Sequence, residues 1–75
     1  MCLISIAGKG VDKYSDKLLD GLRTADNTNT DGIGYSFKRN STKKVFISKG
    51  YTDIEEVINK LKTHKLRIDD ELIVH

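Results

Sequence analysis

The stretch IGYSFKRNSTKKVFISKG, residues 33–50, shows the plan of the fold most directly. In its first half, Ile33, Tyr35 and Phe37 alternate with small or polar residues, as strand residues do when one face of a sheet is buried. The second half, from Val45 onwards, is rich in strand-forming residues, and a polar Asn-Ser-Thr-Lys segment separates the two halves. This pattern predicts a β-hairpin.

The residues before the hairpin predict one strand and one helix. The apolar residues 2–7 end at Gly8 and are typical of a short strand that is buried on both faces. Residues 11–27 place leucines at helical spacing, and either Ser15 or Asp12 is a suitable N-cap. We therefore expect a strand followed by a helix.

The residues after the hairpin predict a second helix and a fourth strand. Thr52 and Glu55 form a capping-box pattern in front of an apolar stripe that covers residues 54–61. His64 is expected on the solvated end of this helix. The last four residues, LIVH at 72–75, are typical of a strand, and the sequence stops there without a turn or cap.

The predicted element order is therefore β-α-β-β-α-β, an α+β fold. Residues 1–75 contain no internal repeat, linker or low-complexity tract, so they form a single domain or part of one. On this pattern alone a ferredoxin-like split β-α-β architecture is the simplest choice, and other arrangements of the same elements stay open.

The charge pattern does not favour a nucleic-acid partner. The 13 basic and 11 acidic residues leave a formal charge of only +2. A basic cluster surrounds the predicted hairpin tip and consists of Lys38, Arg39, Lys43 and Lys44. Because strand alternation sends the neighbouring aromatic residues into the core, we interpret this cluster as protection of a sheet edge.

The remaining polar residues are interpreted as structural. His64 and His75 are far apart in sequence and have no acidic or cysteine residues at ligand spacing, so no metal site is predicted. Lys9, Lys13 and Lys17 are expected on one exposed flank.

The cysteine content and hydropathy predict a cytoplasmic environment. A single cysteine cannot form an internal disulfide, and no stretch approaches the ~18 consecutive apolar residues that a membrane span needs. The first residues lack the basic region of a secretory signal.

The single cysteine, Cys2, directly follows the initiator Met1. If Met1 is removed, the thiol lies beside its own α-amino group, whose pKa of ~7.7–8.0 suits it to act as a base. N-terminal threonine enzymes use the same logic. A buried structural cysteine is the alternative interpretation.

Four stretches carry a resemblance to a known family. They are CLISIAG (2–8), KLLDGLRTADNTNTDGIGYSF (17–37), KVFISKGYTDIEEVINKL (44–61) and ELIVH (71–75). In order and spacing they resemble the opening half of the class II glutamine amidotransferase domain, a member of the N-terminal nucleophile hydrolases. The resemblance covers essentially the whole chain.

The resemblance implies a fold and a chemistry. The fold would be half of an αββα sandwich, and Cys2 would attack the side-chain amide of glutamine, form a thioester and release ammonia. Asp31, Gly32 and His75 stand at the positions that border the substrate in the family. No metal or cofactor is implied.

The family's substrate-binding Arg and oxyanion-hole Asn-Gly pair would lie beyond His75. We therefore expect the remainder of the amidohydrolase domain, or another subunit, as a partner, and we expect the isolated chain to be inactive.

The chain also departs from the common family pattern. Thr28 and Asn29 stand where an Arg-Gly pair is usual, and Leu3 replaces the commoner Gly. The Asn-x-Asp-Gly form at residues 29–32 resembles a divergent, often phage-borne branch, which would place the protein in a host cytoplasm or a virion. The alternative function is a non-catalytic α+β structural or binding module that keeps the same half-fold.

Overall fold

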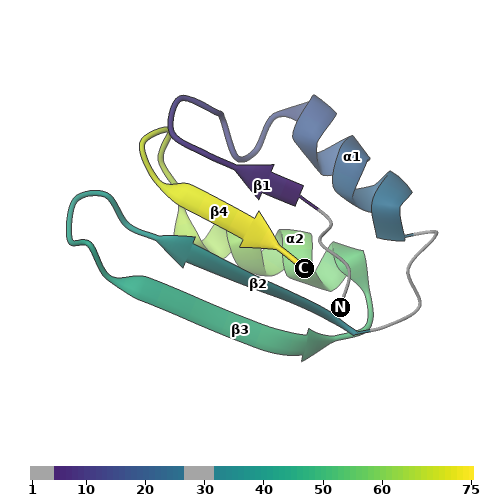
Figure 1. Cartoon of the computed structure of the whole chain (residues 1–75). Coiled ribbons are helices and arrows are strands. Elements are labelled where there is room, and N and C mark those ends of the chain that lie inside the picture. The colour runs from purple at the N-terminus through teal and green to yellow at the C-terminus, as the bar shows by residue number, and fades with distance from the viewer. Residues whose placement is uncertain (1–4, 27–31) are drawn as a thin grey trace.

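The computed structural model describes residues 5–26 and 32–75 (Figure 1). Its elements follow one another in the predicted β-α-β-β-α-β order. They are β1 (Ser5–Ala7), α1 (Asp16–Asp26), β2 (Ile33–Lys38), β3 (Val45–Tyr51), α2 (Ile54–His64) and β4 (Glu71–Val74). The predicted α+β class and the predicted hairpin are confirmed.

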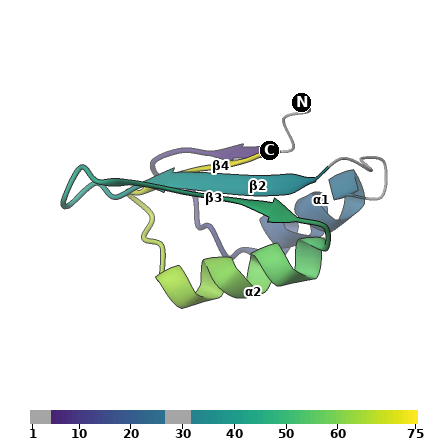
Figure 2. The same ribbon diagram turned by 90° about the horizontal axis from the view of Figure 1, so that it is seen from below.

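The strands form one sheet in the order β1-β4-β2-β3, and all neighbouring strands are antiparallel. β4 lies between β1 and β2, and β2 lies between β3 and β4. Each β-α-β unit is thus split by one strand, and β2 and β4 occupy the centre of the sheet. Figure 2 shows that both helices pack on the same face of the sheet.

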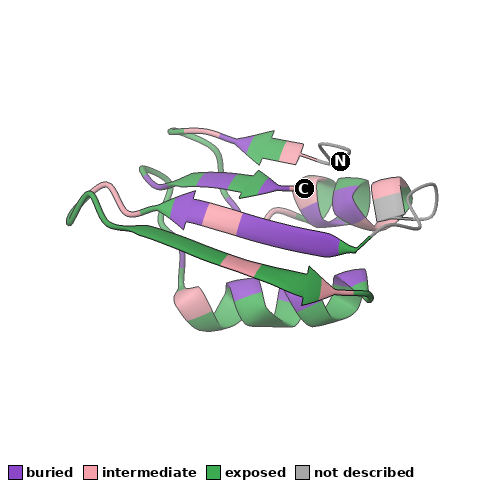
Figure 3. Cartoon of the chain, turned by 60° about the horizontal axis from the view of Figure 1, so that its bottom comes forward, coloured by how far each residue is buried: buried purple, intermediate pink, exposed green. Residues whose placement is uncertain are grey.

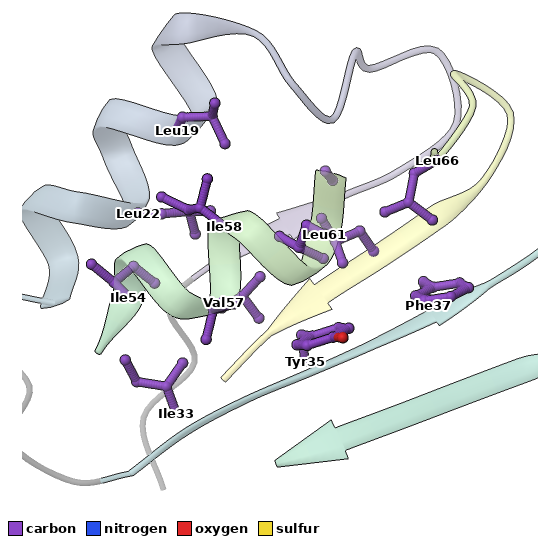
Figure 4. Close-up of a cluster of buried hydrophobic side chains, with 13 residues drawn as sticks. Leu19, Leu22, Ile33, Tyr35, Phe37, Ile54, Val57, Ile58, Leu61 and Leu66 are labelled. Atoms are coloured by element: carbon purple, nitrogen blue, oxygen red, sulfur yellow. The ribbon is translucent and has the colours of Figure 1, made fainter. Parts of the chain in front are cut away.

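The core lies between the two helices and this face of the sheet (Figure 4). Val57 and Leu61 of α2 are fully buried, and they pack over Tyr35 of β2, which is 1% exposed. The buried apolar residues are Ala7, Leu19, Leu22, Ile33, Tyr35, Phe37, Ile54, Val57, Ile58, Leu61, Leu66, Leu72 and Val74. Burying one such side chain contributes roughly 1.5–3 kcal/mol, so this layer dominates the stability of the fold.

The first strand is only half covered, which corrects the expectation that it is buried on both faces. Ala7 is buried against the helices, whereas Ile6 is 63% exposed. The reason is topological, because β1 is an edge strand and the helices cover only one face of the sheet. The part of the predicted strand before Ser5 lies outside the described residues.

The helix α1 begins after Ser15, one of the two N-cap residues considered. The hydroxyl of Ser15 accepts a hydrogen bond from the Leu18 N–H at 3.2 Å. Asp12 instead stabilises the preceding turn, where its carboxylate accepts from the Tyr14 N–H at 2.9 Å. The first residues of the predicted helix are therefore part of the connection from β1.

The helix α2 is capped one residue later than the Thr52 pattern indicated. Asp53 is its N-cap, and the Asp53 carboxylate accepts from the Glu55 N–H at 3.0 Å. The helix ends at His64, and its C-cap, Lys65, adopts a left-handed conformation with φ 52°. An aspartate satisfies the free N–H groups of the first turn as well as a threonine does.

A buried polar network joins the loops at the end of the sheet where β2 ends and β4 begins. Asp70 is 1% exposed; its carboxylate is paired with Arg39 at 3.1 Å and accepts from the N–H groups of Asn40 and Arg67. Burial alone would raise the pKa of Asp70, but these donors outweigh it and hold the pKa below its usual range. The network fixes the start of β4 against the hairpin tip.

Lys13 belongs to the same end of the molecule, and its predicted exposure is wrong. It is 1% exposed, and its ammonium group donates to the carbonyl oxygens of Gly8 and Ile68, both at 2.8 Å. Burial lowers the pKa of Lys13, and nearby acidic residues, Asp70 foremost, partly counteract this effect. Nothing in the residues around Lys13 indicates that two loops supply carbonyl groups to this lysine.

Candidate functional site

The sheet face opposite the helices, which we call the open face, carries a row of isoleucines. Ile6 pairs with Ile73, Ile73 with Ser36, and Ser36 with Ile47, so the row crosses all four strands. Ile6 and Ile47 are 63% and 66% exposed, and Figure 3 shows how much of β3 is exposed. Within the described part of the chain, no element covers this face.

The open face contains a shallow pocket at the end of the sheet where β2 begins. We call it the glycine pocket; its volume is about 220 Å³. It is lined by Gly32, Ile33, Gly34, Lys49, Gly50 and His75. Two of the residues expected at the substrate site, Gly32 and His75, therefore lie in the same pocket.

His75 is held in the pocket by the backbone of Gly34. The N–H of each residue donates to the carbonyl oxygen of the other, at 2.7 and 2.8 Å. The absence of a side chain at Gly34 also leaves space for the imidazole, since a Cβ there would lie only 2.9 Å from Cε1 of His75. Gly34 thus positions His75 through two backbone hydrogen bonds and leaves room for its ring.

Lys49 is a pocket residue that the sequence analysis did not identify. It pairs with Gly34 across β2 and β3, and the missing Cβ of Gly34 would lie 3.0 Å from the Cβ of Lys49. Its position depends on the register of the hairpin, which shifts by a bulge between Ile33 and Gly34. Hydrophobic alternation alone does not indicate such a bulge.

Two of the expected site residues, Cys2 and Asp31, lie outside the described residues, so their place in the site stays a prediction. The first described residues that follow them in the sequence, Ser5 and Gly32, both lie at the end of the sheet that contains the glycine pocket. Ser5 of β1 pairs with Val74, which directly precedes His75, and Gly32 itself lines the pocket.

His64 lies on the other face, at the end of α2 as predicted, but its side chain is half-buried and not fully solvated. Its ring packs against Tyr35, Phe37 and Phe46, with centroids 4.7–5.7 Å away. Its Nε2 is 2.8 Å from the Tyr35 hydroxyl. Burial lowers the pKa of His64, and the positive charges of Arg39 and Lys60 lower it further. His64 therefore packs against aromatic residues on the helix-covered face, and it does not line the glycine pocket.

Comparison with known proteins gave no match to any family model, curated protein or solved structure. Among residues 5–26 and 32–75, no three His, Cys, Asp or Glu side chains come together as a metal site would require. Neither helix in these ranges has the length and apolar character needed to cross a membrane.

Proposed function

We propose that this chain is the nucleophile-bearing part of an N-terminal cysteine amidohydrolase similar to class II glutamine amidotransferases. The observation that carries the proposal is the glycine pocket. It brings together Gly32 and His75, which come from distant parts of the sequence and which the family pattern assigns to one site. The family resemblance rests on the sequence alone, and the shared position of Gly32 and His75 in one pocket is a structural observation that supports it.

The proposed reaction begins after Met1 is removed. The α-amino group of Cys2 takes the thiol proton, and the thiolate attacks the side-chain amide carbon of glutamine. The C–N bond breaks, the proton is passed to the leaving ammonia, and a thioester remains on Cys2. Water then cleaves the thioester, which releases glutamate and restores the thiol.

Lys49 gives the glycine pocket a preference for anionic groups. Its side chain borders the pocket beside His75, and none of the described residues that line this pocket is acidic. A free glutamine carries an α-carboxylate, which a nearby ammonium group would attract. We assign Lys49 to substrate binding, together with Asp31, Gly32 and His75.

The open face is the surface that the remainder of the domain, or another subunit, would cover. Two packed sheets bury the apolar side chains of both inner faces, and the isoleucine row supplies such side chains here. Covering this face would also enclose the glycine pocket. The proposed reaction uses no metal or cofactor. We propose a cytoplasmic location for the protein, or a place in the virion if the protein is viral.

The test uses the polypeptide as it is isolated from cells, with any partner that accompanies it. Intact mass first shows whether Met1 is absent. Glutamine hydrolysis is then measured for the original protein and for Cys2→Ala, which is expected to lower the rate at least 1,000-fold. Lys49→Ala is expected to raise KM for glutamine with little change in kcat, and Lys17→Ala on α1 is the matched control. Full activity in Cys2→Ala would refute the proposal.

A non-catalytic binding module is the second candidate, and the exposed isoleucine row favours it, because large exposed apolar patches mark interaction surfaces. This function predicts a retained Met1 and no glutaminase activity. It further predicts that Ile73→Asp weakens assembly with the partner, while Cys2→Ala leaves assembly unchanged.

A further inference from the structure

The strand β3 is the longer of the two edges of the sheet. It has seven residues, whereas the described part of β1 at the other edge has three. Among the described residues, β3 pairs with β2 alone. In an edge strand, alternate residues direct their N–H and C=O groups outward, where another strand can pair with them.

The first five residues of β3 pair regularly with β2, and the first three of them are apolar, which we call the apolar centre of this regular part. Its register with β2 is continuous from Val45 to Lys49, and Val45, Phe46 and Ile47 are 63%, 42% and 66% exposed. The regular part is followed by Gly50, whose φ is +92°. An incoming strand could therefore pair with a segment of five residues whose register is continuous.

The hairpin that contains β3 carries only positive charges on its side chains. From 32 to 52 the chain has five of its 13 basic residues and none of its 11 acidic residues. Lys44 precedes the apolar centre and Lys49 follows it, and both are exposed. An antiparallel second copy of β3 would bring the lysines of both copies together, so self-pairing is opposed by like-charge repulsion.

We propose that β3 binds an extended segment of a partner protein that has acidic residues on both sides of a short β-branched centre. The segment adds to the sheet as a fifth strand, and its backbone pairs with the free edge of β3. Its central side chains pack beside Val45 and Ile47, and its acidic ends face Lys44 and Lys49. This surface shares Lys49 with the glycine pocket, but strand pairing at the edge of β3 requires no reaction in that pocket, so the proposal does not depend on the proposed function.

A nucleic acid fits this surface less well than a peptide strand. The aromatic residues Tyr35 and Phe37 of the adjacent strand are 1% and 6% exposed, and Phe46 of β3, which is 42% exposed, stacks on Phe37. Of these three rings only Phe46 is accessible to a base, so they form no extended stacking platform. The free backbone groups of an edge strand instead match those of an extended peptide.

The test is an NMR titration of the full chain with a synthetic nine-residue peptide, Val-Thr-Val-Thr-Val with two glutamates at each end. We expect amide shifts centred on residues 45–49, slower hydrogen exchange of the outward amides of β3, and weaker binding at high salt. A peptide with lysines in place of the glutamates should bind at least tenfold more weakly.

Charge reversal makes the test sharper. The double variant Lys44→Glu and Lys49→Glu should prefer the lysine-flanked peptide, whereas Lys17→Glu on α1 should keep the original preference. Because all three lysines are exposed, these changes leave the core intact. Shifts centred away from β3, equal binding of both peptides, stronger binding of a short RNA at β3, or a concentration-dependent dimer through β3 would each overturn the proposal.

Discussion

The two faces of the sheet are built from the same strands and differ sharply in what they do. In β4, Leu72 and Val74 are 2% and 1% exposed on the helix side, whereas Ile73 between them is 39% exposed on the open face. The helix-covered face contains the core, while the open face has the isoleucine row and the glycine pocket. One face therefore stabilises the fold, and the other is available for contacts.

The largest expected effect tests this comparison within one strand. Leu72→Ala should lower the free energy of unfolding by about 2–5 kcal/mol, because it leaves a cavity in the core. Ile73→Ala, on the open face, should lower it by less than about 1 kcal/mol. Urea unfolding followed by circular dichroism measures both. Equal losses would mean that the open face is covered in solution, and the comparison of the two faces would fail.

A smaller effect is expected for Gly34→Ala on the open face. The new Cβ would meet the His75 ring at 2.9 Å, Lys49 Cβ at 3.0 Å and a Ser48 backbone oxygen at 3.1 Å. Such overpacking costs about 1–3 kcal/mol. Gly32→Ala is the control, since the new Cβ would lie 3.7 Å from the Tyr51 carbonyl oxygen, an ordinary contact distance.

Removing the His75 imidazole separates its contribution to the destabilisation from the contributions of Lys49 and Ser48. His75→Ala in the Gly34→Ala background should recover part of the lost stability, because one of the three close contacts disappears. No recovery would show that His75 does not rest on Gly34.

The smallest expected effect concerns the helix-covered face and depends on pH. Because the pKa of His64 is lower in the folded chain, the unfolded chain binds a proton more readily. The stabilisation is complete above the unfolded pKa of about 6.5, and stability decreases as the pH falls through that value towards the folded pKa. Unfolding curves between pH 7.5 and 5.5 measure this decrease.

Two substitutions check the cause of the pH effect. His64→Gln should make the decrease smaller, because the titrating ring is gone while a polar group remains near the Tyr35 hydroxyl. Lys60→Gln should also make the loss of stability at low pH smaller, but by less than His64→Gln does, since it removes one positive charge that lowers the pKa of His64. An unchanged decrease in both variants would exclude His64 as its source.

The candidate site was only partly predictable. Gly32 and His75 were identified from a family pattern, and the structure places both in one pocket. Lys49 was missed because its position depends on a bulge in the β2–β3 register. The solvation of His64 was overestimated because a residue near a helix end is fully solvated only if no strand lies beneath it, and the aromatic residues that surround it come from β2 and β3.

The sequence by itself determined the elements and their order. The hairpin, the apolar stripe of α2 and the Ser15 cap depend on residues close together in the chain, where spacing and local hydrogen bonding decide the outcome. Only the tertiary structure decided that β4 inserts between β1 and β2, that one sheet face stays open, and that Lys13 is buried. These features depend on pairing between residues distant in sequence, and periodicity along the chain does not specify which distant partners meet.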